Sequence, residues 1–143
     1  MDFFLFLLIL FIFTISSGKA ETPEEIVKNF EIRYKKLIEA KDYDNLLRSS
    51  GLRMNFTVGK ISGEYGEHFV HLIFKENLAV FNGTSLKTLQ VRSEGGSFIG
   101  QHKLENGKVI VYRVKKCDAN DTSPYSDDCN IKEKYVISGY EEK

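Results

Sequence analysis

The sequence LKTLQVRSEGGSFIGQHKLENGKVIVYRVKK, residues 86–116, alternates runs of strand-forming residues with two pairs of turn residues. The pairs are Gly95-Gly96 and Asn106-Gly107, and both are typical of two-residue β-hairpin loops. Together with an apolar run near the C-terminus, they predict a four-stranded antiparallel meander. Its strands are expected at residues 86–93, 97–105, 108–116 and 130–140.

The residues before the meander predict two helices. Thr22-Pro23-Glu24-Glu25 combines a capping Thr, a Pro at the first helical position and a Glu at the third, so a helix should begin there. Apolar residues then recur at helical spacing from Ile26 to Ile38, and the helix is expected to continue to about Lys41. Asp42 can cap a short second helix, which Gly51 would end.

A strand and a third helix lie between these helices and the meander. Residues 52–58 alternate apolar and polar side chains, which predicts a half-buried strand with Asn55 facing outward. Residues 59–63 are expected to form a turn region. Apolar residues at helical spacing predict a helix over residues 64–74, although Gly66 weakens that prediction.

The two cysteines, Cys117 and Cys129, predict a disulfide bond, because an even pair in a small extracellular domain is usually bridged. Closing the loop between them would stabilise the fold by about 3 kcal/mol. Metal binding is the alternative, but two thiolates at this spacing, with no nearby His, match none of the usual zinc sites.

The turns and the disulfide together predict which residues face one another. Two-residue loops place His102 opposite both Leu89 and Val111, and a directly cross-strand disulfide places Val111 opposite Tyr135. This row is expected on the face that packs against the long helix, with these neighbours: Val91, Phe98, Gly100, Leu104, Val109 and Ile137. The opposite, outer face is expected to carry these apolar residues: Ile99, Ile110, Tyr112, Val114 and Val136.

The N-terminus predicts a cleaved signal peptide over residues 1–20. The apolar run from Phe3 to Ile15 is shorter than the roughly 20 residues that span a membrane, and small residues follow it. Cleavage after Gly18 and cleavage after Ala20 both fit. A signal anchor, or a buried N-terminal helix in a cytosolic protein, is the alternative. Three glycosylation sequons favour secretion, and their acceptors are Asn55, Asn82 and Asn120.

Residues 21–143 then form a single domain, because a chain of this length suits one hydrophobic core. The whole chain has 20 Lys and Arg residues against 20 Asp and Glu residues, so its formal net charge is zero. This balance argues against a nucleic-acid-binding protein, which needs a basic surface.

The order of the expected elements resembles the nuclear transport factor 2-like (NTF2-like, SnoaL-like, cystatin-like fold) superfamily. The likeness rests on Ile26 to Asp42 followed by Tyr43 to Phe56, which is similar to the opening of that family, and on a leader comparable to those of secreted nematode-type members. The resemblance implies an α+β fold in which a bent antiparallel sheet wraps around the long helix. It also implies a pocket between them. Members include isomerases, dehydratases, cyclases, transport adaptors and binding domains, so the fold does not fix the function.

A ligand pocket is therefore expected between the sheet and the long helix. Its predicted lining consists of Leu89, His102, Val111, Tyr135, Phe30, Tyr34 and Leu37. His102 is the candidate general base of an isomerase- or dehydratase-type enzyme, because a partly desolvated imidazole exchanges protons near neutral pH. The simpler interpretation is a core histidine satisfied by its neighbours, since no second carboxylate is expected to face inward.

A second cluster predicts possible metal ligands on the third helix. Glu64, Glu67, His68 and His71 share one face if residues 64–74 are helical. A solvent-exposed polar face explains the same pattern more simply. No nucleophile elbow, phosphate-binding loop or dinucleotide fingerprint occurs in the sequence, so no cofactor is expected.

We therefore expect a secreted, glycosylated, non-catalytic protein that binds a small apolar ligand or a protein partner. The alternatives are the enzyme just described, a cystatin-like inhibitor, and a module that dimerises through the outer sheet face around Tyr112 and Val136. A cystatin-like inhibitor is less favoured because the sequence has no Gln-x-Val-x-Gly loop. No nucleic-acid partner is expected, and no membrane association after the signal peptide is removed.

Overall fold

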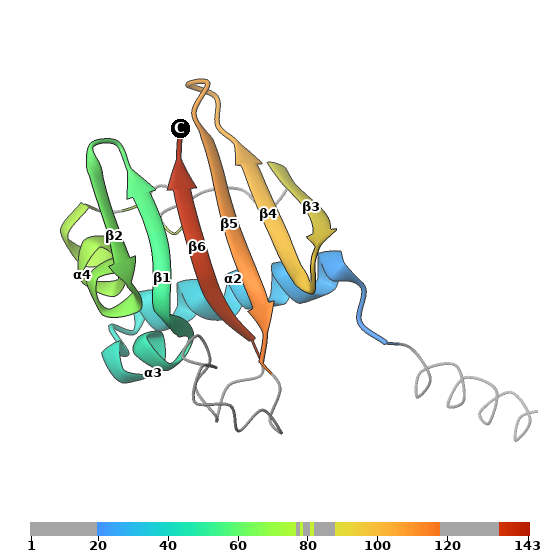
Figure 1. The fold of residues 1–143 in the computed structure, drawn as a ribbon, viewed down its shortest axis with the longest axis horizontal. Coiled ribbons are helices and arrows are strands. Elements are labelled where there is room, and N and C mark those ends of the chain that lie inside the picture. The colour runs from blue at the N-terminus through green and yellow to red at the C-terminus, as the bar shows by residue number, and fades with distance from the viewer. Residues whose placement is uncertain (1–19, 77, 79–80, 82–87, 118–134) are drawn as a thin grey trace, which may run out of the picture.

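The computed structural model describes residues 20–76, 78, 81, 88–117 and 135–143, which form an α+β fold with helices packed on one sheet (Figure 1). The helices are α2 (Pro23–Glu39), α3 (Tyr43–Arg48) and α4 (Gly66–Glu76). The strands are β1 (Ser50–Val58), β2 (Ile61–Tyr65), β3 (Leu89–Glu94), β4 (Ser97–Lys103), β5 (Val109–Lys116) and β6 (Tyr135–Glu142). The predicted signal peptide lies outside the described residues, except for Ala20.

The first two predicted helices are confirmed, with their caps. Thr22 Oγ1 accepts a hydrogen bond from the Glu25 amide at 3.2 Å, and Asp42 Oδ1 accepts one from the Asn45 amide at 3.4 Å. The prediction that Gly51 ends the second helix is wrong. Helix α3 ends at Arg48, and Gly51 already lies inside β1.

The turn expected over residues 59–63 is instead a turn followed by a strand, β2. Gly59 has a φ of 60° and begins the turn, and β2 then pairs antiparallel with β1. Helix α4 begins at Gly66 rather than at residue 64. A Cβ atom at Gly66 would collide with the backbone oxygen of Gly51, so glycine lets the start of α4 lie directly against β1.

The sheet has the strand order β2-β1-β6-β5-β4-β3. The strands from β3 to β6 form the predicted antiparallel meander, whereas β1 pairs with β6 in the parallel direction. The sheet is therefore mixed rather than wholly antiparallel. Strand β6 lies between β1 and β5 and so joins the N-terminal part of the sheet to the meander (Figure 1).

The predicted register is confirmed at the first turn and wrong at the second. Gly95 and Gly96 have φ values of 54° and 81°, and Leu89 faces His102 as expected. At the second turn, Leu104 and Lys108 close a three-residue loop, and only Gly107 in it has a positive φ, of 83°. His102 consequently faces Ile110 instead of Val111.

The pairing of β5 with β6 also differs from the prediction. Tyr135 lies opposite Lys116, not opposite Val111, and a bulge inserts Ser138 between the pairs Val114–Ile137 and Arg113–Gly139. The buried positions of β5 are therefore Ile110, Tyr112 and Val114, while Val109 and Val111 belong to the outer face. Tyr112 and Val136, the expected centre of an exposed dimer face, are 2% and 0% exposed.

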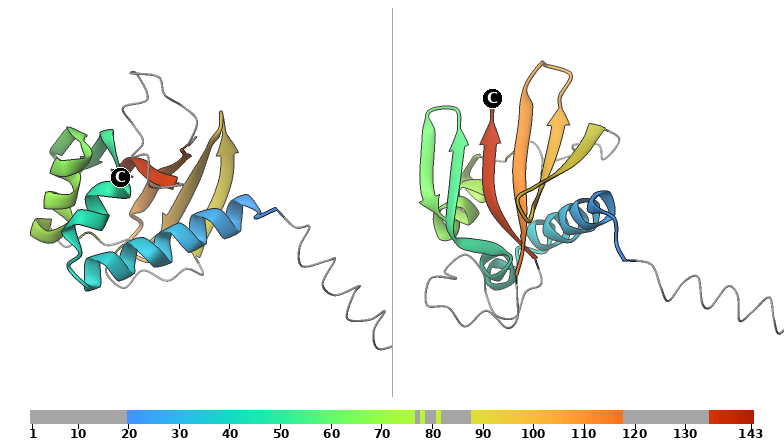
Figure 2. Two further views of the ribbon diagram at one scale, coloured as in Figure 1. Left: turned by 90° about the horizontal axis from the view of Figure 1, so that it is seen from below. Right: turned by 45° about the vertical axis from the view of Figure 1, so that its right-hand side comes forward.

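Helices α2 and α4 cover the inner face of the sheet and share its core (Figure 2). The ring of Phe81 links the two helices to the last strand. Its centroid lies 5.0 Å from that of Tyr34 on α2, 6.3 Å from that of Phe69 on α4 and 5.8 Å from that of Tyr140 on β6. The side chains at the centre of this layer are fully buried: Val27, Tyr34, Leu46, Met54, Phe69, Val70, Ile110, Tyr112, Val114 and Ile137. The described part of the inner face is thus closely packed with apolar side chains.

Candidate functional site

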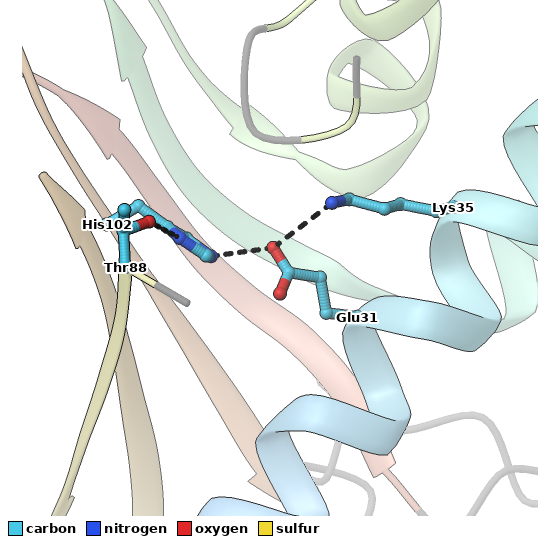
Figure 3. A network of polar contacts seen from close by, with 4 residues as sticks. All are labelled: Glu31, Lys35, Thr88 and His102. Atoms are coloured by element: carbon cyan, nitrogen blue, oxygen red, sulfur yellow. Dashed lines mark hydrogen bonds and ion pairs between the residues drawn. The ribbon is translucent and has the colours of Figure 1, made fainter. Parts of the chain in front are cut away.

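A buried polar cluster lies between helix α2 and strand β4 (Figure 3). His102 projects from β4 toward the helix, and its Nε2 atom lies 2.7 Å from Oε1 of Glu31 on α2. Both side chains are 0% exposed. The helix places Glu31 one turn after Val27 and just under one turn before Tyr34, which puts the carboxylate on the apolar face of α2.

The second ring nitrogen of His102 is also occupied. Its Nδ1 atom lies 2.8 Å from the hydroxyl oxygen of Thr88, the residue just before β3. In the tautomer that carries its proton on Nε2, the imidazole donates to the Glu31 carboxyl oxygen and its Nδ1 accepts from the Thr88 hydroxyl. With both nitrogens engaged, the imidazole directs neither a proton nor a lone pair toward solvent.

Lys35 supplies positive charge to the same carboxylate. Its Nζ atom lies 3.9 Å from Oε1 of Glu31, one helical turn further along α2, and its side chain is 18% exposed. The lysine stem can lie along the buried surface while its ammonium group stays near water. The arrangement gives the buried carboxylate two potentially cationic neighbours, an imidazole and an ammonium group (Figure 3).

Tyr112 borders the cluster from strand β5. Its ring stacks on that of His102, with centroids 6.2 Å apart. Burial of the hydroxyl, followed by the negative charge of Glu31, raises the pKa of Tyr112 above its ordinary value. By distance and angle, neither the Tyr112 hydroxyl nor Glu31 Oε2 has a hydrogen-bond partner among the described residues.

The predicted pocket residues do not all meet. Leu89, His102 and Tyr135 from the sheet, and Phe30, Tyr34 and Leu37 from α2, contribute to the inner layer. Val111 lies on the opposite face, because the second hairpin loop is one residue longer than expected. Tyr34 is tied into the core by a 2.7 Å hydrogen bond to Ser50.

Glu31 is the residue that sequence reasoning missed. The expectation that no second carboxylate faces inward is wrong, because Glu31 is fully buried beside His102. The sequence contained the signal. Glu31 occupies the helical stripe of Val27, Phe30 and Tyr34, and a charged residue within an apolar stripe is buried only when it has a partner.

The four candidate metal ligands do not share a helix face. Glu64 belongs to β2, whereas Glu67, His68 and His71 lie on α4. Over the described ranges, no group of three or more His, Cys, Asp or Glu side chains could hold a metal ion. His68 and His71 instead contact aromatic rings, with centroids 5.5 Å from Tyr65 and 6.1 Å from Tyr43.

The outer face of the sheet carries an open hollow of about 810 Å³, which we call the outer trough. Its lining residues are Arg53, Asn55, Glu64, Tyr65, Ser97, Arg113, Lys115 and Ser138. A neighbouring hollow of about 750 Å³ shares Asn55 and Arg113 with it and includes Gly139. The bulge in β6 places the small residues Ser138 and Gly139 between the longer side chains of β1 and β5, which explains why this face is hollowed.

The predicted modification sites are only partly described. Asn55 is exposed on β1 and borders both outer hollows, whereas Asn82 and Asn120 lie outside the described residues. Cys117 is buried just after β5, and Cys129 lies outside the described residues. Glycosylation and the disulfide bond therefore stay predictions. No helix among residues 20–76 and the other described segments is long and apolar enough to cross a membrane.

Comparison with solved structures identifies the fold. A variant of a protein named Rd1NTF2_05 superposes with a TM-score of 0.51 at 10% sequence identity, covering 82% of this chain and 96% of its own. The chain has an NTF2-like fold. A second structure, named "Rd1NTF2_05 with long sheet", gives a TM-score of 0.47 at 14% identity and covers 80% of this chain and 93% of its own. The sequence matches no protein-family model and no curated protein. At these identities, the NTF2-like likeness describes the fold alone.

Proposed function

We propose that this NTF2-like protein is a secreted, non-catalytic binding domain whose binding surface is the outer trough. The observation that carries the proposal is the contrast between the two faces of the sheet. The described inner face is closely packed and both nitrogens of its histidine are occupied, whereas the outer face is open and lined by polar side chains. Secretion is supported by the apolar leader, the sequons and the cysteine pair.

The charge of the outer trough favours an acidic partner. Three of its lining residues, Arg53, Arg113 and Lys115, are cationic and one, Glu64, is anionic, in a chain whose net charge is zero. Glu94 lies 3.6 Å from Arg113, but both side chains are about half exposed, and such surface pairs contribute little stability. A carboxylate-rich protein segment can therefore compete for Arg113 at small cost. We infer that the partner is an acidic protein surface rather than a small apolar ligand.

A matched pair of lysines tests this proposal. Lys115 lines the outer trough, and Lys116 follows it on β5 but belongs to the other face. We expect a glutamate-rich peptide to bind the purified protein with an affinity that falls as salt rises, and Lys115→Gln to weaken binding several-fold. Calorimetric titration measures both effects. The control, Lys116→Gln, should bind like the natural protein.

Two results would count against the acidic-partner proposal. One is the absence of salt-dependent binding, and the other is an equal loss of affinity in Lys115→Gln and Lys116→Gln. Because Asn55 borders the trough, the titration should be repeated after enzymatic removal of N-glycans, which shows how far a glycan there limits access.

A second candidate, an enzyme of the isomerase or dehydratase type, is supported by one observation. Glu31 lies within hydrogen-bond distance of His102, as a carboxylate that orients a catalytic imidazole would. A catalytic His102 must be reachable by substrate. The chain has three histidines, and the other two, His68 and His71, are exposed on α4.

Chemical labelling separates the two candidates. For a non-catalytic domain, we expect diethyl pyrocarbonate to modify His68 and His71 in the native protein and to leave His102 unmodified, as read by peptide mass spectrometry. The reagent modifies imidazole nitrogens that solvent can reach, and His102 is 0% exposed. Labelling of His102 in the folded protein would favour the enzyme.

A further inference from the structure

An apolar groove, separate from the outer trough, lies between the β1–β2 hairpin and helix α4. Strand β2 ends the strand order on this side of the sheet, and α4 lies behind β1 and β2 (Figure 1). The groove has a volume of about 470 Å³, and we call it the edge groove. None of its described lining residues lines the outer trough, so the two hollows are separate surfaces.

The floor of the edge groove is apolar and closely packed from below. The Phe56 ring lies where a Cβ atom of Gly63 would stand, and it packs against Phe69 with ring centroids 5.5 Å apart. Ile61 from the hairpin and Leu72 from α4 complete the floor. Ile61 is 42% exposed, which is unusual for a large apolar side chain of the described surface. Covering this floor removes apolar surface from water, which stabilises a bound hydrocarbon chain.

The rim of the edge groove on α4 is cationic or can become so. His68, His71 and Lys75 recur at i, i+3 and i+7, which places them on one face of the helix. Aromatic neighbours hold the two imidazoles, with ring centroids 5.5 Å from Tyr65 and 6.1 Å from Tyr43. Lys75 is exposed, and among the described residues no ion pair engages its ammonium group. The rim therefore offers a positive charge directly beside an apolar floor.

This pattern is complementary to an anionic amphiphile. A hydrocarbon chain needs no hydrogen-bond partner and suits the apolar floor, whereas a peptide brings backbone polar groups that need partners. A carboxylate at the end of that chain would meet the ammonium group of Lys75. The acidic residues of α4, Glu67 and Glu76, do not line the groove, so no described lining residue repels the carboxylate.

We propose that the edge groove binds a fatty acid, with the alkyl chain over Phe56, Ile61 and Leu72 and the carboxylate at Lys75. This ligand differs in position and in chemistry from the acidic protein segment proposed for the outer trough. Either proposal can therefore fail without affecting the other.

Calorimetric titration with decanoate and with decanol tests this site, because the two probes have the same alkyl chain length and differ in head-group charge. We expect decanoate to bind more tightly than decanol. Lys75→Gln should weaken decanoate binding about threefold, the effect of one surface charge, and should leave decanol binding unchanged. The matched control is Lys36→Gln, because Lys36 is an exposed lysine in the last turn of α2, as Lys75 is in the last turn of α4.

A second pair of variants tests the apolar floor. Ile61→Ser removes apolar surface from the groove and should weaken both decanoate and decanol about fivefold. Leu52→Ser is the matched control, because Leu52 is 63% exposed on β1 and lines neither the edge groove nor the outer trough. Circular dichroism should confirm that all four variants are folded, which is expected because each position is exposed.

The proposal is overturned if decanoate does not bind below its micelle concentration, or if decanol binds as tightly. It is also overturned if either variant and its control lose affinity equally, because the ligand then lies elsewhere. Competition between decanoate and the glutamate-rich peptide would place the fatty acid in the outer trough. Binding to phosphatidylglycerol vesicles without binding to free decanoate would make this face a membrane-binding surface instead, and either result excludes the proposed site.

Discussion

Replacing His102 with leucine should lower the free energy of unfolding by about 3–5 kcal/mol, which is the usual cost of leaving a buried carboxylate without its partner. The substitution leaves the Glu31 carboxylate in the core without the imidazole that lies 2.7 Å away. Lys35 cannot replace that bond, because its Nζ atom is 3.9 Å from the same oxygen and near solvent. Urea denaturation at neutral pH measures the loss.

The double variant Glu31→Leu with His102→Leu is the informative companion. Replacing both members of a buried pair with apolar residues is often neutral or stabilising, so most of the lost stability should return. Arg92→Leu is the surface control, because Arg92 and Glu94 form a pair at 3.5 Å with both side chains more than half exposed. Its cost should stay below about 1 kcal/mol. If the double variant is no more stable than His102→Leu, the unpaired Glu31 carboxylate is not the cause of the lost stability.

The second large effect is a loss of stability in alkali. Burial raises the pKa of three tyrosines above the ordinary value near 10: Tyr34, Tyr112 and Tyr140. Hydrogen bonding to Glu142 adds to the shift at Tyr140. Because the folded state holds these protons more tightly than the unfolded state, the stability they contribute is complete below pH 10. Above that pH it should fall by about 1.4 kcal/mol per pH unit for each tyrosine.

Tyrosinate absorbance and urea denaturation between pH 9 and about 12 measure this effect. The three buried hydroxyls should ionise only as the protein unfolds, so their absorbance change and the loss of circular dichroism should coincide. Tyr34→Phe removes one of the three buried hydroxyls, so the free energy of unfolding should fall less steeply as the pH rises. Tyr65→Phe changes a side chain that is 53% exposed, and it should leave this dependence unchanged. Ionisation of all tyrosines before unfolding would contradict the burial argument.

Much of the NTF2-like fold could be predicted because its local signals are strong. The capping residues Thr22 and Asp42 and the glycine pair at 95–96 each have one dominant structural outcome, and each prediction is confirmed. Strand β2 was missed because all but one of its residues are exposed, so it shows no alternation between apolar and polar positions. An edge strand of this kind is fixed by pairing with β1 and not by its own sequence.

The register error has a specific cause. Asn106-Gly107 is typical of a two-residue loop, which requires a positive φ at both residues. Here Asn106 Oδ1 accepts a hydrogen bond from the Lys108 amide at 3.0 Å, and only Gly107 has a positive φ. The asparagine caps a longer loop, and the extra residue exchanges the two faces of β5. One turn residue thus decided whether Tyr112 or Val111 faced the core.

The position of β6 limits when the domain can form. Residues 135–142 are made after every other described element, yet they fill the centre of the sheet and connect β1 to β5. Until they leave the ribosome, β1 and β5 have no neighbour on their facing sides, so the growing chain cannot complete its core. The sheet therefore closes only after residues 135–142 have been made, although the helices and the other strands precede them in the chain.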